Sequence, residues 1–205
     1  SPAAMYLAAS GVGKLSLNDF DEVELSNLQR QIAHRMDTIG QPKVDSAQST
    51  INTLNPQIEI NPIHGKLDDD ELRGHIAQAD VVLDCCDNYN ARFAINKACL
   101  DVGKPLVSGA SLRFEGQLSV FDFRRPDSPC YQCLHPEAGE EESCSQAGIL
   151  APTVGMVGCM QAIEAIKVCL EIGDTLCGRL LLMDTLRMDF RTLKLRKNPD
   201  CPACH

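Results

Sequence analysis

The chain of 205 residues has no tryptophan, and aromatic residues make up only 4% of it. It also has no excess of positive charge, since its formal net charge is −9 at pH 7. An acidic chain without a basic stripe repels the phosphate backbone of nucleic acid, so we expect no direct nucleic-acid partner. An anionic nucleotide is still compatible with this charge, because a few Arg and Lys side chains and backbone N–H groups can hold it locally.

Long apolar runs are scarce as well. We find no run that approaches the ~18–20 residues needed to cross a bilayer, and the first residues do not resemble a signal peptide, so we expect no membrane partner. Cysteine is abundant instead: there are 11, an odd number that argues against a fully paired disulfide framework. Disulfide scaffolds are usually short and rich in loops, which this chain is not. We therefore expect a reducing, cytoplasmic location.

The apolar pattern predicts alternating helices and strands within a single domain over residues 1–205. Helices are expected at residues 1–10, 43–55, 68–77, 88–102 and 153–172, and strands at 14–19, 59–63, 80–85, 104–110, 116–123 and 178–184. The early strands alternate with helices, which is typical of a parallel sheet, whereas the later strands are longer. We predict an α/β fold with a Rossmann-like mixed sheet, parallel in its N-terminal part, with antiparallel strands added C-terminally.

Four of the cysteines form two C-x-x-C pairs. Cys130 and Cys133 lie in "PCYQCL", and Cys201 and Cys204 lie in "CPACH". Each pair places two thiolates on one tight turn, and two such turns together make a tetrahedral zinc site, which we predict here. Four thiolates leave no position for water, so this zinc would be structural. The alternatives are two unrelated pairs or a redox pair. A redox pair normally opens a helix after a strand in a thioredoxin-like unit, and we expect neither pair to do so.

A strand-end carboxylate gives the first nucleotide signal. Asp19 ends a predicted strand, where an α/β unit places an acid for the ribose hydroxyls about 20 residues after a Gly-rich loop. "GVGK" at residues 11–14 is not that loop, because it precedes a strand and lacks the third glycine. We expect the chain to begin after its own first strand and phosphate loop. Taken alone, Asp19 is only a carboxylate at the end of a strand.

The next segments add charged groups to this signal. The loop "DFDEVELSNLQRQ" carries Arg30, and Lys43 follows at the start of a helix, so the two cations are candidates for holding a triphosphate. "DCCDN" places Asp84 and Asp87 after a buried strand, where a carboxylate beside phosphates is a natural Mg²⁺ ligand. The alternatives are a solvated loop with ordinary surface charges and a helix cap made by Asp87 or Asn88.

Together these residues resemble a known family. The motifs that carry the resemblance are "SNLQRQ", "GQPK", "LNPQI", "DVVLDCCDN", "PLVSGA", "EGQLSVF", "CYQCL", "AGILAPTVGMVG", "QAIEAIK" and "CPAC". They are similar, in this order and over essentially the whole chain, to the MoeB/ThiF/HesA group, the bacterial relatives of ubiquitin-activating enzymes. "SGASLRFEGQ", "LDDDEL" and "KNPDCPAC" look closer to the branch of molybdenum cofactor synthesis than to the thiamine branch.

The resemblance implies an adenylyltransferase that acts on the C-terminal glycine of a small β-grasp sulfur-carrier protein, of the kind that forms the small subunit of molybdopterin synthase. It implies ATP, Mg²⁺ and structural Zn²⁺ as cofactors. The implied catalytic groups are Arg30, Lys43 and Asp87, with Asp87 also binding Mg²⁺. The implied nucleotide-binding residues are Asp19, Ser26, Asn27, Leu28, Gln29, Arg30, Lys43, Asp87 and Asn88. Cys130, Cys133, Cys201 and Cys204 match the zinc ligands of the family.

A further cysteine, Cys144 in "EESCSQAG", matches one that the family carries on a crossover loop. Some branches use this cysteine covalently, so Cys144 is a further catalytic candidate. The neighbouring carboxylates of Glu140, Glu141 and Glu142 are expected to raise the pKa of its thiol and to weaken it as a nucleophile. The branch of molybdenum cofactor synthesis does not need it.

The chain differs from the family at its N-terminal end. The Gly-rich loop, first strand and N-terminal helical segment of the family are missing from these 205 residues, and we expect them to precede Ser1. In the family this segment reaches across a homodimer, so a homodimer is implied. The alternatives are activation of a carrier for thiamine synthesis or tRNA thiolation, a zinc-clipped scaffold that binds a β-grasp protein without activating it, and a nicotinamide dehydrogenase. A rhodanese domain beyond His205 would indicate tRNA thiolation or another sulfur pathway.

Overall fold

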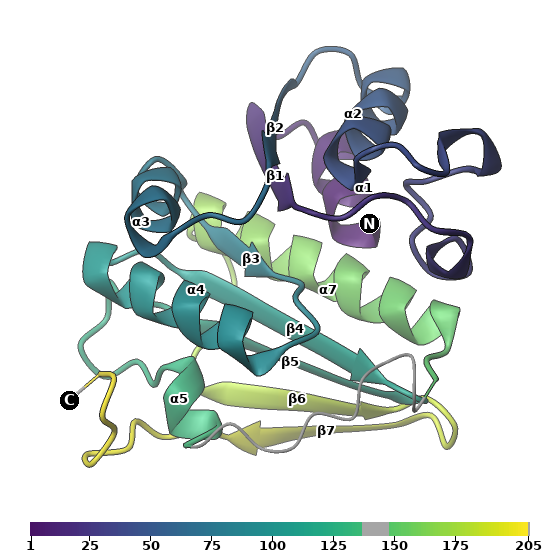
Figure 1. Ribbon diagram of the computed structural model, residues 1–205. Helices are drawn as coiled ribbons and strands as arrows, with labels where there is room; N and C mark the ends of the chain where they lie inside the picture. The colour runs from purple at the N-terminus through teal and green to yellow at the C-terminus, as the bar shows by residue number, and fades with distance from the viewer. Residues whose placement is uncertain (137–147, 205) are drawn as a thin grey trace.

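A computed structural model describes residues 1–136 and 148–204 (Figure 1). Its helices are α1 (Pro2–Ala9), α2 (Lys43–Leu54), α3 (Asp69–Ala77), α4 (Tyr89–Val102), α5 (Tyr131–Leu134) and α7 (Ala151–Leu170). Its strands are β1 (Lys14–Asp19), β2 (Glu59–His64), β3 (Val82–Asp84), β4 (Leu106–Leu112), β5 (Glu115–Phe121), β6 (Arg179–Asp184) and β7 (Asp189–Lys194). The 3₁₀ turns η1 (Leu25–Asn27) and η2 (Met36–Thr38) lie between β1 and α2.

The N-terminal unit is a small parallel sheet with helices beside it. β1 pairs with β2 in parallel, with Asp19 opposite His64 at the carboxyl end. Ala8, Ile51 and Ile58 are buried together, so α1, α2 and the approach to β2 share one small core. The loop from β1 to α2 is closed at its base, where Val23 N–H donates to Gln41 O at 2.9 Å.

The larger unit is a five-stranded sheet in the order β3-β4-β5-β6-β7. β3 and β4 are parallel, and the other neighbours are antiparallel. Helices cover both faces: α3 and α4 lie on one side of the sheet and α7 on the other (Figure 1). Two separate clusters of buried side chains fill these interfaces, one around Val107, Leu118 and Ala162 and one around Cys99, Leu106 and Phe121. The result is a three-layer α/β arrangement.

Local signals explain where α3 and α4 begin and end. The Asp68 side chain accepts from the N–H groups of Asp70 and Glu71, and the Glu71 carboxylate accepts from Asp68 N–H, which is a capping box. Asn88 caps α4 by accepting from Ala91 N–H at 2.8 Å. α4 ends at Gly103, whose φ of 69° is a left-handed conformation that glycine adopts without a steric penalty.

One close contact joins the two units. A Cβ atom added at Gly158 in α7 would lie 2.9 Å from Pro2 Cβ in α1. Glycine therefore lets α1 lie directly against α7, and a side chain at this position would push the helices apart. By length and apolar composition, α7 also qualifies as a membrane span, which corrects the sequence expectation, but 44% of its apolar window is buried against the rest of the fold. It serves here as a core helix.

The predicted α/β class, with parallel strands first and antiparallel strands later, is confirmed. Hydrogen bonding divides the strands into two sheets, and this division was not predicted. β7 was missed, because residues 189–194 are charged and mostly exposed and therefore lack the alternation of a half-buried strand. Cys130 is the N-cap of α5, but α5 has only four residues and does not directly follow a strand, since β5 ends at Phe121. This short turn places Cys130 and Cys133 on one side.

Candidate nucleotide site and four-cysteine cluster

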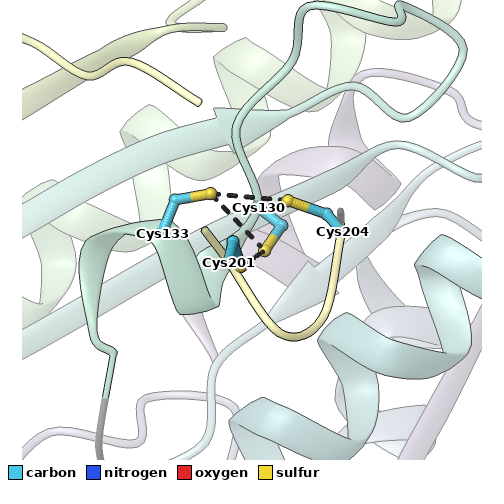
Figure 2. A group of neighbouring side chains, drawn as sticks. All are labelled: Cys130, Cys133, Cys201 and Cys204. Atoms are coloured by element: carbon cyan, nitrogen blue, oxygen red, sulfur yellow. Dashed lines mark hydrogen bonds between the residues drawn. The ribbon is translucent and has the colours of Figure 1, made fainter. Parts of the chain in front are cut away.

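The four predicted zinc cysteines come together in the structure. The ligand atoms of Cys130, Cys133, Cys201 and Cys204 all lie within 4.8 Å of one another (Figure 2). The Sγ–Sγ distances are 3.6 Å for Cys130–Cys201, 3.5 Å for Cys133–Cys204 and 3.9 Å for Cys130–Cys133. A disulfide needs about 2.05 Å, whereas a tetrahedron with Zn–S bonds of about 2.3 Å separates its sulfurs by about 3.8 Å. The cluster therefore fits a zinc ion.

The backbone around the cluster holds the thiols in place. Cys130 is buried at the start of α5, and Cys201 N–H donates to Asn198 O at 3.1 Å, which forms the second turn. Asn198 N–H points at Cys133 Sγ at 3.4 Å, a contact that favours a thiolate. Burial, with the nearby Cys133 adding to it, raises the pKa of Cys130 to about 11. Zinc must therefore displace a proton from this thiol when it binds.

The predicted nucleotide residues gather around Lys43. The Lys43 side chain is only 10% exposed, and its Nζ lies 2.8 Å from Asp21 Oδ2 and 3.8 Å from Asp19 Oδ1. Burial is the main cause that raises the pKa of Asp19, and the carboxylates of Asp21 and Asp87 raise it further. The carboxyl ends of β1 and β3 thus bring Asp19 and Asp87 within electrostatic reach of each other, although they are far apart in sequence.

For Asp87 and Asn88 the sequence left open two roles, a Mg²⁺ ligand and a helix cap. Asn88 caps α4 through its Oδ1, so the capping alternative is correct for this residue. Its amide Nδ2 lies 3.5 Å from Asp87 Oδ1. Asp87 is exposed, and its negative charge is close enough to raise the pKa of Asp19. A carboxylate in this position is suited to a hydrated Mg²⁺ ion.

The "SNLQRQ" loop is held mainly by its own contacts. Asn27 is buried, and its Oδ1 accepts from Glu24 N–H at 3.1 Å. Arg30 Nη1 donates to Ser26 O at 3.2 Å, and Ser26 Oγ donates to Glu24 Oε2 at 3.1 Å. Leu28 is half-buried and Gln29 is exposed. The hydrogen bonds of Asn27 and Arg30 in the described residues stay within the loop, so the structure does not itself join them to Lys43.

The far part of this loop is fixed to α2. His34 Nδ1 lies 2.9 Å from Ser46 Oγ, and Ser46 Oγ donates to Thr38 Oγ1 at 2.9 Å. Thr50 Oγ1, one turn further along α2, donates to Ala33 O at 2.7 Å. Burial is the main cause that lowers the pKa of His34 to about 4, and the positive charge of Lys43 adds to it, so this imidazole is neutral at pH 7. Gln31 Oε1 is buried and has no hydrogen-bond partner among residues 1–136 and 148–204.

Asp84, the other strand-end acid, serves the fold. It is 1% exposed, and its carboxylate accepts from Ser108 Oγ at 2.8 Å and from Cys86 N–H at 2.9 Å. The guanidinium of Arg92 lies close by and donates to Cys86 O at 2.5 Å. The sequence did not identify Arg92. Its place in the first turn of the helix after "DCCDN" is the signal that points to it.

Cys144, the remaining catalytic candidate, lies outside the described residues together with Glu140, Glu141 and Glu142. Its relation to the nucleotide residues and to the cysteine cluster is therefore not assigned. The site as described consists of the group around Lys43, the loop before α2 and the four-cysteine cluster.

The fold and these groups define a class: an α/β domain with strand-end acids and a buried lysine at the carboxyl ends of parallel strands, and with a separate four-cysteine cluster. The chain matches the ThiF family over residues 1–203, and it belongs to this family. The family assignment agrees with the resemblance seen in the sequence.

Curated relatives are similar over nearly the whole chain. The molybdopterin-synthase adenylyltransferase of Escherichia coli is 46% identical over 203 residues, which cover 98% of this chain and 81% of the relative. The enzyme of the same name from Haemophilus influenzae is 49% identical over 197 residues, 96% of this chain and 81% of the relative. An adenylyltransferase and sulfurtransferase of Bos taurus is 44% identical and matches 99% of this chain, which spans 45% of it.

Solved structures support the fold. The crystal structure of Escherichia coli MccB with ATP superposes with a TM-score of 0.84 at 19% identity, covering 99% of this chain. The complex of MccB with a variant of MccA gives a TM-score of 0.86 at 20% identity. The chain spans 62% and 63% of these two proteins.

Proposed function

We propose that this protein uses ATP to adenylate the C-terminal glycine of a small β-grasp sulfur carrier of the molybdopterin-synthase type. The observation that carries the proposal is the convergence of Asp19, Lys43 and Asp87 in a chain 46% identical to the Escherichia coli molybdopterin-synthase adenylyltransferase. The relative's name supplies the substrate class, and the gathered charges supply a place for ATP.

The reaction is an in-line displacement at phosphorus. A carboxylate oxygen of the carrier attacks the α-phosphorus of ATP, the bond between this phosphorus and the bridging oxygen breaks, and pyrophosphate leaves with the electron pair. Such transfers depend on positioning and on stabilising the charge that develops on the phosphate oxygens. Lys43 is suited to this role, because its buried ammonium group pairs with Asp21 and Asp19 in the described part of the chain.

The other residues take supporting roles in this proposal. Asp19 accepts hydrogen bonds from the ribose hydroxyls, Asn27 and Arg30 hold phosphate oxygens, and Gln31 offers its free amide oxygen to the nucleotide. Ser26, Leu28, Gln29 and Asn88 line the nucleotide. A Mg²⁺ ion held by Asp87 would neutralise phosphate charge and orient the triphosphate. The adenylation step itself does not use Cys144.

The cysteine cluster acts at a distance from this chemistry. Zinc held by four thiolates has a filled tetrahedral shell, so it stabilises the fold without a position for a reacting water. We further propose that residues 1–205 are one domain, that the protein works as a homodimer in the cytoplasm, and that it binds neither membrane nor nucleic acid directly. Two observations support one domain: α1 and α2 share a small core, and α1 lies directly against α7.

Carrier-dependent exchange of pyrophosphate into ATP tests the proposal. The complete gene product is offered the molybdopterin carrier and the thiamine carrier in separate reactions, each with its Gly-Gly C-terminus. Exchange with the molybdopterin carrier alone is the expected result. Exchange only with the thiamine carrier, or with a carrier for tRNA thiolation, would move the protein to that pathway. Binding of a carrier without any exchange would indicate the scaffold alternative.

A further inference from the structure

A basic cleft lies at one end of the strands of the large sheet, where β5 ends, β6 begins and β7 ends. It consists of two adjoining hollows of about 390 Å³ and 360 Å³ that share Arg125 and Cys177. Its charged lining residues are Arg125, Asp127, Asp174, Arg179, Lys194, Arg196 and Lys197. None of these residues takes part in the proposed adenylation.

The basic cleft lies at the opposite end of the strands from the nucleotide residues. β3 and β4 run in parallel from Val82 and Leu106, and Asp87 follows the carboxyl end of β3. Leu106, at the start of β4, pairs with Phe121, at the end of β5, so residues just after Phe121 lie at the amino ends of the parallel strands. Figure 1 shows β6 starting and β7 ending near α5 and the C-terminal turn, away from the carboxyl end of β3.

The cleft concentrates positive charge on an acidic protein. Five cations face two carboxylates there, although the whole chain has a formal net charge of −9. Lys194 and Arg196 form no ion pair within residues 1–136 and 148–204, and Arg125 meets Asp127 only at 3.5 Å. Arg179 and Lys197 donate to the carbonyls of Thr175 and Pro126 rather than to acids. Clustered like charges repel, so an anion bound here would relieve this repulsion.

The walls of the cleft are fixed before any ligand binds. Leu195 N–H donates to Gly178 O at 2.8 Å, which ties the exit of β7 to the entry of β6. Ser128 Oγ accepts from Asp122 N–H at 3.0 Å and contacts Cys177 Sγ at 3.6 Å, which ties the end of β5 to the same place. Holding cations in a preformed arrangement reduces the entropy lost when a partner binds.

We propose that the basic cleft is a docking site for an acidic segment of a partner protein, whose Asp and Glu side chains face Arg125, Arg179, Lys194, Arg196 and Lys197. The two hollows adjoin at Arg125 and Cys177 and carry cations along both, so they suit an extended peptide with several carboxylates. The acidic surface of the rest of the chain repels a long polyanion such as nucleic acid. A short acidic segment contacts only the cleft and therefore avoids this repulsion. Guanidinium groups bind carboxylates in a bidentate fashion, which gives the site geometric selectivity.

A fluorescein-labelled peptide of ten glutamates tests the proposal by fluorescence anisotropy at about 50 mM and about 200 mM salt. We expect binding that weakens with salt, and at least a tenfold loss of affinity in the double variant Lys194→Gln/Arg196→Gln. The matched control is Lys66→Gln/Arg187→Gln, which removes the same charge from exposed positions elsewhere. Thermal unfolding of both variants checks that the fold is kept, since Lys194 and Arg196 make no ion pair in the described structure.

Two further readouts decide where the peptide binds and what the site selects. The peptide is expected to slow alkylation of Cys177, which lines both hollows, and to leave the exposed Cys169 unaffected, as read by mass spectrometry of the digested protein. Equal loss of affinity in the control variant, or an unprotected Cys177, would overturn the proposal. Tighter binding of a ten-nucleotide DNA strand than of the peptide would overturn the choice of an acidic protein segment. Carrier-dependent exchange is a separate assay, so its failure leaves this test intact.

Discussion

The four-cysteine cluster and the group around Lys43 are held in different ways. The cluster brings four ligand atoms of one kind within 4.8 Å, and Cys130 and Cys201 are buried while Cys133 and Cys204 are partly buried. The group around Lys43 brings together charges of opposite sign that now satisfy one another, with Nζ 2.8 Å from Asp21 Oδ2. One region is built around a single small ion, and the other has to release its internal pairs before it can hold a ligand.

This difference shows what each region needs from its partner. A zinc ion completes a set of four thiols that come from two distant turns, so its binding energy becomes folding energy. A nucleotide instead competes with Asp21 and Asp19 for the same ammonium group. We therefore expect loss of zinc to appear first in stability and loss of Lys43 to appear first in activity.

Loss of the zinc clip should have the largest effect. Cys201→Ser removes one of four ligands and is expected to lower the free energy of unfolding by about 3–5 kcal/mol, or roughly 10 °C in melting temperature. Calorimetry together with zinc content by mass spectrometry measures this. Cys169→Ser is the control, because Cys169 is exposed and lies outside the cluster. Equal melting temperatures for the two variants would show that the cluster does not hold a structural metal.

Lys43→Ala should mainly reduce activity and leave stability largely unchanged. We expect carrier-dependent exchange to fall about 10²–10³-fold, the size of effect seen when one charge-stabilising group is removed from a reacting centre. The melting temperature should change far less than in Cys201→Ser. Lys14→Ala is the control, since Lys14 pairs with Glu59 on the surface of β1 and β2. Unchanged exchange in Lys43→Ala would exclude Lys43 from the nucleotide site.

Asp87→Asn should have a smaller effect that depends on magnesium. The variant keeps the size of the side chain and the Asn88 cap of α4, but it removes the carboxylate proposed to bind Mg²⁺. We expect exchange to fall about 10–100-fold at low Mg²⁺ and to recover partly at high Mg²⁺. A loss that is the same at every Mg²⁺ concentration would argue for a role of Asp87 without metal.

The smallest effect concerns pH. Burial is the main cause that lowers the pKa of His34 to about 4, so the unfolded chain binds a proton more readily than the folded one. Stability should therefore fall as pH decreases from about 6.5 towards 4, by about 1 kcal/mol because the ring is only partly buried. Urea unfolding across this range measures it, and His34→Asn should flatten that part of the profile. An unchanged profile in the variant would show that another group is responsible.

The sequence predicted best what depends on short spacing. The two C-x-x-C pairs each fix their geometry within four residues, so the cluster was predictable from the pattern alone. The meeting of Asp19 with Asp87 depends on how β1 and β3 are placed, and it was inferred only from the general rule for parallel strands. The structural duty of Asp84 could not be predicted, because it depends on Ser108 from the neighbouring strand.

β7 and the basic cleft show the limit of pattern analysis. The residues of β7 are mostly exposed, so no alternation marks them as a strand. The cations of the cleft come from three segments, around residues 125, 179 and 194–197, and in the sequence only "KLRK" stands out. The pairing of Arg179 with Lys194 in the β6–β7 register brings two of these segments together, and the contact of Ser128 with Cys177 brings in the segment around residue 125.

The separation of the cysteine pairs makes metal affinity a measure of the whole C-terminal half. Cys130 and Cys201 lie 71 positions apart, and α7, β6 and β7 lie between the pairs. The two pairs can meet only when these elements are folded, so a change that disrupts the packing of α7, β6 or β7 also separates the pairs and weakens zinc binding. A substitution in the core between α7 and the sheet, far from any thiol, would then be detected as a change in zinc affinity in a metal titration.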